Sequence, residues 1–180
     1  MRAKIISIVW GTVLAAAWAL PARAEPPDEA PKTVLSNQQI QQALQAPVTR
    51  SFTPRGLARR QPSDSGQSVN LNIPFEHNSS ALMPQASEQL KQLELALTSS
   101  SLGKDRFEVA GHTDAKGSAQ YNKQLSLRRA EAVKRFLIAK GMDAGRLTTV
   151  GYGSEKLLAP DRPDDSSNRR VEIRDLGAAN

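Results

Sequence analysis

The stretch that most constrains the fold runs from residue 107 to residue 140, FEVAGHTDAKGSAQYNKQLSLRRAEAVKRFLIAK. Phe107 and Val109 alternate with polar residues, which predicts a half-buried strand. Gly117 and Ser118 then favour a turn and a helix start. Apolar residues follow at helical spacing and predict a buried stripe: Tyr121, Leu125, Ala132, Val133, Phe136 and Leu137. The stretch therefore predicts a strand, a polar turn and a long amphipathic helix.

Polar residues of the same stretch are expected to meet at one place. Asp114 lies where the strand ends, and Asn122, Ser126 and Arg129 share one face of the helix because they are four and three residues apart. That face begins at the turn that carries Asp114, so Asp114 and Arg129 are predicted to face one crevice, the usual kind of ligand site at strand ends. Spacing alone leaves an alternative open, in which Asp114 caps the helix and Arg129 forms an ion pair with it or with a neighbour.

The segment GHTDAKGSAQYNKQLSLRRAEAV resembles the central motif of the OmpA C-terminal-like, peptidoglycan-binding domain family. A later segment, NRRVEI at residues 168–173, is similar to the closing strand of that family, and the resemblance covers roughly residues 68–176. It implies an α/β fold that binds the diaminopimelate residue of the peptidoglycan stem peptide without a covalent bond. The partner implied is peptidoglycan, in the periplasm or at the outer membrane of a Gram-negative envelope.

The same resemblance implies roles for individual residues. The free end of diaminopimelate is a zwitterion, so Asp114 would take its ammonium and Arg129 would take its carboxylate through two parallel hydrogen bonds. The other implied positions supply neutral hydrogen bonds, an aliphatic wall and a second arginine: Thr113, Asn122, Leu125 and Arg170. For the second arginine, Arg170 is preferred over its neighbour Arg169.

The rest of the domain is predicted at residues 68–177, with a tail at 178–180. Alternation through Val69, Leu71 and Ile73 predicts a first strand, and Pro84 opens a first helix. Two further strands are predicted after the long helix, around residues 147–152 and 171–173, with a polar, proline-rich, mobile loop at 155–167 between them. The order strand, helix, strand, helix, strand, strand predicts a βαβαββ α/β sandwich of one mixed sheet with helices packed against it.

Residues 1–24 are predicted to be a cleavable signal peptide. A basic start is followed by an apolar run at residues 5–20 and by the small-x-small sequence that ends at Ala24. An uncleaved anchor is the alternative, although 16 apolar residues fall short of the about 20 that a membrane-spanning helix needs. The sequence has no cysteine, which excludes a lipid-modified cysteine, a disulfide and a thiolate metal site.

Residues 25–67 are predicted to be a flexible tether, because prolines recur through them and large apolar residues are few. Ser36 is a candidate cap for a short helix that carries Ile40 and Leu44 on one side. Such a short helix is unstable alone and needs a partner surface. A basic cluster follows, and its alternative role is contact with anionic lipid, polysaccharide or an acidic partner: Arg50, Arg55, Arg59 and Arg60.

Neither catalysis nor nucleic-acid binding is predicted. Three of the 24 basic residues and none of the 18 acidic ones precede the cleavage point, so the formal charge of +6 falls to +3 in the mature chain, too little for a nucleic-acid protein. No nucleophile, metal or cofactor motif is present, and His112 is predicted to be a packed, hydrogen-bonded core residue. The alternatives kept open are an adaptor whose tether binds a protein or a membrane and, third, an enzyme that modifies peptidoglycan.

Overall fold

The computed structural model describes residues 34–45 and 67–178 of the 180-residue chain. The predicted signal peptide, with its cleavage point, and most of the predicted tether lie outside the described residues. Within the described ranges, no helix has the length and apolar character that a membrane span requires.

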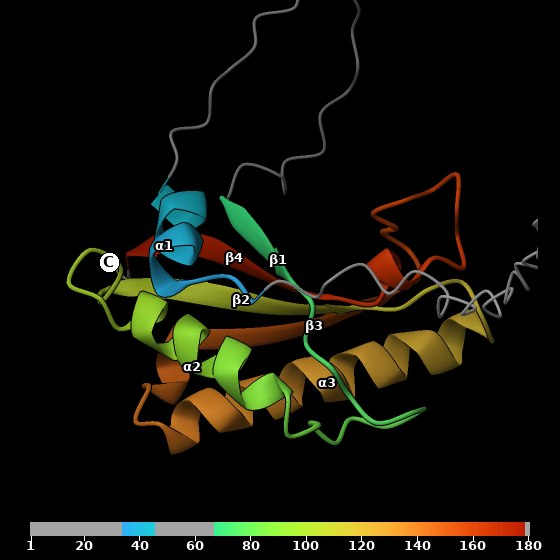
Figure 1. Cartoon of the computed structure of the whole chain (residues 1–180), viewed down its shortest axis with the longest axis horizontal. Helices are drawn as coiled ribbons and strands as arrows, with labels where there is room; N and C mark the ends of the chain where they lie inside the picture. The colour runs from blue at the N-terminus through green and yellow to red at the C-terminus, as the bar shows by residue number, and fades with distance from the viewer. Residues whose placement is uncertain (1–33, 46–66, 179–180) are drawn as a thin grey trace, which may run out of the picture. The chain divides into compact units, whose positions relative to one another are not determined.

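The fold is a four-stranded mixed sheet with two helices packed on one face (Figure 1). The strands β1 (Ser68–Leu71), β2 (Asp105–His112), β3 (Leu147–Gly153) and β4 (Val171–Ala178) lie in the order β1-β4-β2-β3. β2 and β3 are parallel, and β4 runs antiparallel to both β1 and β2. The helices α2 (Ala86–Leu97) and α3 (Ala119–Ala139) connect β1 to β2 and β2 to β3. The predicted βαβαββ order is confirmed.

The core forms between the helices and the inward face of the sheet, as the apolar periods predict. Phe107 and Val109 of β2 and Ile173 of β4 are fully buried, and they belong to one cluster with the leucines of α2. α3 begins where Ser118 accepts a hydrogen bond from the backbone of Tyr121 at 3.2 Å. It ends just before Gly141, whose φ of 94° suits glycine at a helix end.

Two glycines let α3 lie unusually close to the sheet. A Cβ atom on Gly111 of β2 would lie 2.0 Å from the carbonyl oxygen of Ser126, and one on Gly151 of β3 would lie 2.5 Å from that of Lys123. Either contact is far inside van der Waals distance. The hydroxyl of Ser126 also accepts a hydrogen bond from the backbone of Gly153 at 2.9 Å. The N-terminal turns of α3 are therefore held directly against the ends of β2 and β3.

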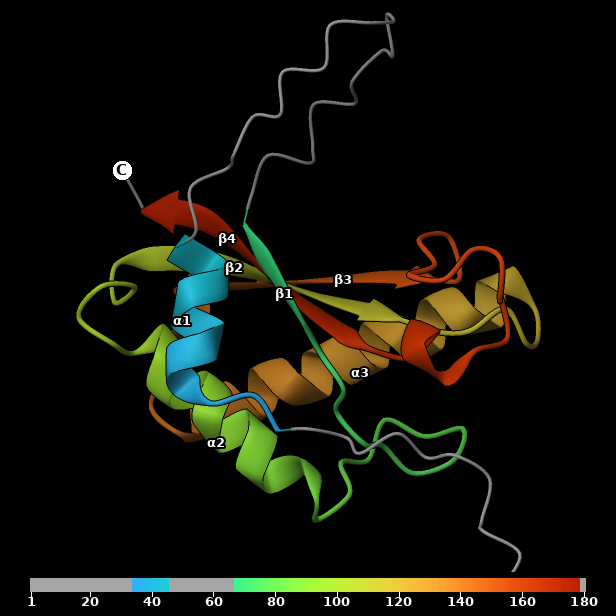
Figure 2. The ribbon, with the colours of Figure 1, turned by 45° about the horizontal axis from the view of Figure 1, so that its top comes forward.

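A further helix, α1 (Asn37–Gln45), packs beside α2 (Figure 2). Ile40 and Leu44 are 0% and 1% exposed and join the main core. The side-chain oxygen of Gln89, itself buried, accepts a hydrogen bond from the backbone of Leu35 at 2.8 Å. The boundary predicted at residue 68 is thus corrected: residues 34–45 belong to the domain and not to a flexible tether. The partner surface that the short helix needs is α2 and β1.

Truncating both buried aliphatic residues of this helix, Ile40→Ala with Leu44→Ala, is expected to release α1. Each truncation removes about 2–5 kcal/mol of burial, but the cost to global stability is limited to the free energy with which α1 docks, because the sheet keeps its own core. Amide hydrogen exchange should accelerate in residues 34–45 and stay slow at Phe107. Gln42→Ala, on the exposed side of α1, is the control. Unchanged exchange in the double variant would show that α1 is held by something other than these two side chains.

The loop predicted to be mobile is organised by one buried side chain. Asn168, the last residue of a short 3-10 helix (Ser166–Asn168), is 0% exposed. Its amide oxygen accepts from the backbone of Ala159 at 2.9 Å, and its amide nitrogen donates to the carbonyls of Arg162 and Pro163 at 2.9 and 3.1 Å. The carbonyl of Pro163 also accepts from the backbone of Ala115, next to Asp114. The loop is therefore tied to the turn after β2.

Candidate functional site

Asp114 lies two residues after the end of β2 and is 8% exposed. Its Oδ2 accepts from Nη1 of Arg169 at 2.8 Å, and its Oδ1 accepts from the backbone of Lys116 at 3.3 Å. The backbone of the preceding residue, Thr113, donates to the carbonyl of Gly153 at 2.9 Å. The turn is therefore fixed to β3 on one side, and the carboxylate is oriented by one guanidinium and one backbone donor.

A cavity of about 430 Å³, here called the Asp114 cavity, opens beside this carboxylate. Its walls come from the turn after β2, from the N-terminal half of α3 and from the loop after β1. Five of the six predicted ligand-binding residues line it: Thr113, Asp114, Asn122, Leu125 and Arg129. The structure thus brings together the acid at the strand end and the arginine on the helix, as the helical spacing predicts.

Arg129 enters the cavity from α3 and is held by two contacts. Its Nε donates to the carbonyl of Ser79 at 3.0 Å, and its guanidinium carbon lies 5.0 Å from the centroid of the Phe75 ring. Burial lowers the pKa of Arg129, and the charge of nearby Arg169 lowers it further. Among the described residues, no acid lies within ion-pair distance of Arg129. Its terminal nitrogens therefore remain able to receive a carboxylate.

Asn122 and Thr113, two other predicted site residues, differ in whether their side chains have hydrogen-bond partners. The amide nitrogen of buried Asn122 donates to the carbonyls of Lys116 and Asp114 at 2.9 and 3.3 Å, so this side chain braces the turn. The hydroxyl of Thr113 is buried and has no hydrogen-bond partner in the described part of the chain. A buried hydroxyl without a partner is costly. Thr113 therefore keeps a hydrogen-bonding group that the described residues do not use.

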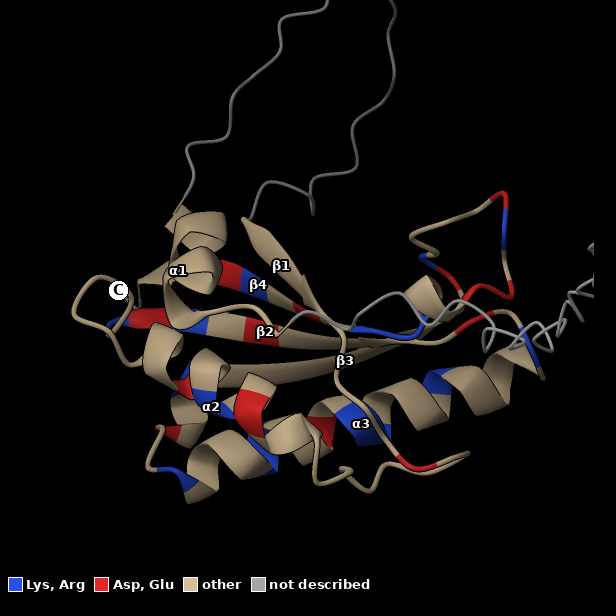
Figure 3. Cartoon of the chain, viewed as in Figure 1, with Lys and Arg blue, Asp and Glu red and all other residues tan. Residues whose placement is uncertain are grey.

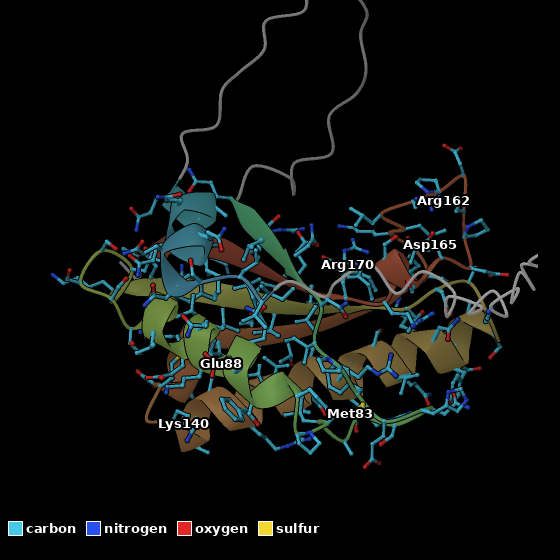
Figure 4. The ribbon with its side chains drawn as sticks, viewed as in Figure 1. Met83, Glu88, Lys140, Arg162, Asp165 and Arg170 are labelled. Carbon is cyan, nitrogen blue, oxygen red and sulfur yellow. The ribbon has the colours of Figure 1, made fainter. Side chains whose placement is uncertain are left out.

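The arginine that reaches Asp114 from the last loop is Arg169 and not Arg170, the second arginine that the family resemblance implies. Arg169 lines the Asp114 cavity, whereas Arg170 does not. Nε of Arg170 instead donates to the side-chain oxygen of Asn70 at 2.7 Å, and the residue lies beside the loop that carries Arg162 and Asp165 (Figure 4). The alternation of a strand could not decide between the two arginines, because both precede β4.

Two aromatic residues of the site escaped the sequence analysis. Tyr121 was assigned to the buried stripe of α3, but it is 40% exposed and lines the cavity, because the first turn of α3 extends beyond the core. The contact of Phe75 with Arg129 joins positions 54 residues apart, which no local spacing indicates. Its position after Pro74, beyond the alternation that predicts the first strand, is the one available signal.

A network of buried charged groups lies next to the site. Acidic and basic positions follow each other along β4 (Figure 3). The Nε2 of His112 lies 3.2 Å from Oε2 of Glu172, and Nη2 of Arg174 lies 3.1 Å from Oε1 of the same carboxylate. The pKa of Glu172 is lowered to about 2, first by the hydrogen bond from His112 and then, against the effect of burial, by hydrogen bonds from Ser68 and Arg174 and by the charge of Arg174. The prediction that His112 is a packed, hydrogen-bonded core residue is confirmed.

A mixed sheet with helices on one face, and with a carboxylate and two guanidinium groups around a cavity at the strand ends, defines a small α/β ligand-binding domain. The chain belongs to the OmpA family, which matches residues 74–170, more than half of its length. The family resemblance stated from the sequence is confirmed.

Relatives in sequence and in structure agree with this assignment. The chain is 38% identical over 102 residues to the peptidoglycan-associated lipoprotein of Pseudomonas aeruginosa, which covers 56% of this chain and 59% of that protein. It is 37% identical over 106 residues to outer membrane porin F of Pseudomonas fluorescens, covering 58% of this chain and 32% of that protein. The chain thus spans less than two thirds of these relatives.

Solved structures give the same fold. The cell wall anchor of the T6SS from Pseudomonas aeruginosa is 28% identical, covers 62% of this chain and 81% of its own, and has a TM-score of 0.52. The periplasmic domain of Helicobacter pylori MotB (residues 78-256) is 26% identical, covers 65% of this chain and 80% of its own, and has a TM-score of 0.55.

Proposed function

We propose that this domain binds peptidoglycan non-covalently through the diaminopimelate residue of the stem peptide, and so attaches an envelope protein to the cell wall. It is a binding domain of the OmpA family and not an enzyme. The observation that carries the proposal is that the carboxylate of Asp114 and the guanidinium of Arg129 line one cavity of about 430 Å³. The proposed location is the Gram-negative envelope, in the periplasm or at the outer membrane.

The cavity is chemically matched to a zwitterion. Asp114 would accept the ammonium group, and its ion pair with Arg169 keeps the carboxylate oriented toward the ligand. Arg129 would bind the carboxylate with two parallel hydrogen bonds, which its planar fork provides and a lysine cannot. Leu125 would contact the aliphatic chain between the two charged ends, and the hydroxyl of Thr113 would gain its missing partner.

The relatives support the same ligand. One is named a peptidoglycan-associated lipoprotein and another a cell wall anchor. Because the chain spans only part of those relatives, their cellular partners do not transfer with the ligand. A protein or outer-membrane partner for the segment before the domain stays a separate prediction.

Simple magnitudes indicate weak binding to one peptide and strong retention on the wall. Two sets of charge-assisted hydrogen bonds contribute roughly 1.5–3 kcal/mol each. After the cost of ordering the ligand, one stem peptide is expected to bind with a Kd between about 1 μM and about 1 mM. The wall presents this peptide at high density, so rebinding keeps the protein attached.

Asp114→Asn and Arg129→Gln are each expected to weaken binding to isolated sacculi by about 10- to 100-fold, because each removes one charge-assisted contact. Cosedimentation with purified sacculi over a range of protein concentrations measures the loss. Free meso-diaminopimelate should compete with the wild-type protein for the sacculi.

Matched controls separate the site from general charge. Arg128→Gln changes the neighbouring exposed arginine of α3, and Asp161→Asn changes an exposed acid in the loop before β4; both should bind like the wild type. Circular dichroism and thermal unfolding confirm that every variant is folded. If the two site variants cosediment as well as their controls do, the Asp114 cavity is not the peptidoglycan site.

A further inference from the structure

A second cavity, of about 170 Å³, adjoins the Asp114 cavity and is here called the Arg170 cavity. The two cavities share Phe75, Arg129 and Arg169, so these side chains form the partition between them. His112 and Arg170 line the smaller cavity only. When one part of a ligand fills the Asp114 cavity, the part bonded next to it can therefore reach this second, polar cavity.

The Arg170 cavity has more positive charge around it than the protein neutralises. Three arginines line it, and in the described part of the chain only Arg169 has an acid within ion-pair distance, the carboxylate of Asp114 in the other cavity. Arg129 donates instead to the carbonyl of Ser79, and Arg170 to three neutral oxygens, the side-chain oxygen of Asn70 and the carbonyls of Lys156 and Asn168, so each terminal nitrogen of Arg170 keeps one N–H for a ligand. Burial lowers the pKa of both. Asp114 and Glu172 act on these two guanidinium groups only from beyond ion-pair distance, so the partly desolvated cations favour an anion in the space between them.

A buried acceptor in the same cavity specifies the anion further. His112 is 1% exposed, and its Nε2 faces the carboxylate of Glu172, which can only accept; Nε2 therefore carries the hydrogen. Nδ1, the other ring nitrogen, is buried with no hydrogen-bond partner among the described residues. The cavity thus offers arginine donors for an anion and one ring nitrogen whose hydrogen bond is unmade.

We propose that the Arg170 cavity binds a free carboxylate together with the amide N–H on the same carbon, supplied by the acidic residue that precedes diaminopimelate in the stem peptide. Arg170 and the cavity side of Arg129 bind the carboxylate, and Nδ1 of His112 accepts from the amide N–H. This inference rests on the proposed function, because it assumes that the zwitterionic residue occupies the neighbouring Asp114 cavity.

Two synthetic tripeptides test the proposal by calorimetry on the whole chain. One is alanyl-γ-glutamyl-diaminopimelate with a free glutamate α-carboxylate, and the other carries a carboxamide there. The wild type is expected to bind the acidic tripeptide about tenfold more tightly, the value of one charge-assisted contact after its costs. In Arg170→Gln the ratio should fall to near one, and in Arg170→Lys it should be intermediate because the charge remains without the fork.

A second readout needs no variant. The ¹⁵Nδ1 resonance of His112 is expected to shift when the acidic tripeptide binds, and free diaminopimelate should leave it unmoved. Equal affinity of the wild type for both tripeptides, or an unmoved His112 resonance with the acidic one, overturns this inference while leaving the Asp114 site intact. Failure of free diaminopimelate and both tripeptides to bind overturns the proposed function as well. Competition by inorganic phosphate as strong as by the acidic tripeptide overturns the assignment to a peptide carboxylate.

Discussion

Gly111→Ala is expected to destabilise the domain by about 3 kcal/mol, the upper part of the usual range for overpacking. The new Cβ would lie 2.0 Å from the carbonyl oxygen of Ser126, and also close to the carbonyl carbon and Cα of that residue. All three are backbone atoms of α3, so no side chain can rotate away. The helix must move off β2 by more than an ångström, which opens the packing of Val133 and Leu137 in the core.

The same displacement should weaken ligand binding, because Arg129 lies on α3 and Asp114 on the turn after β2. Denaturant unfolding followed by circular dichroism measures the stability, and sacculus cosedimentation below the unfolding transition measures binding. Gly145→Ala is the matched control, since the nearest atom to its added Cβ is a side-chain oxygen of Asp143 at 3.4 Å. Equal unfolding midpoints for Gly111→Ala and the control would mean that α3 does not lie as close to β2 as described.

Glu172→Gln is expected to remove about 3 kcal/mol of acid-dependent stability, the equivalent of lowering a carboxyl pKa from 4.5 to about 2. A carboxylate with a depressed pKa stabilises the folded state fully above its unfolded value. That contribution is lost as the pH falls from about 4.5 toward 2, where the folded protein also becomes protonated. The free energy of unfolding should therefore fall steeply in this window in the wild type and much less steeply in the variant.

The effect depends on burial, and an exposed pair supplies the control. Glu172 is 8% exposed and bonded to both His112 and Arg174. Glu155 pairs with Lys123 at 2.9 Å, but both side chains are more than half exposed, so Glu155→Gln should change stability by less than about 1 kcal/mol. Urea unfolding at a series of pH values between 2 and 7 compares them. Parallel pH profiles for the wild type and Glu172→Gln would rule out Glu172 as a major source of acid sensitivity.

Gly111→Ala and Glu172→Gln change residues that position the binding site as well as residues that stabilise the fold. Both residues position elements that carry the site. Gly111 sets the distance between β2 and α3, and Glu172 fixes the ring of His112 beside Thr113 and Asp114. A site held by rigid strands and a closely packed helix loses little entropy on binding. Both variants should therefore affect affinity through the position of Asp114 relative to Arg129, without touching the ligand.

The sequence by itself determined the order and type of the main elements, and which side chains lie at the strand end. Period-two and helical spacings are local properties, so β2, α3 and the common face of Asn122 and Arg129 follow from neighbours in the chain. The turn between β2 and α3 is equally local, because its glycine and its Ser118 cap occupy adjacent positions.

The tertiary structure alone decided what depends on distant partners. Asp114 pairs with Arg169, not Arg170, across 55 residues, and Leu35 bonds to Gln89 across 54, which brings α1 into the domain. Asn168 organises the loop before β4 because it is buried, and burial depends on the whole core. Such contacts depend on how separate elements pack, and neither periodicity nor composition encodes that geometry in a form that can be read locally.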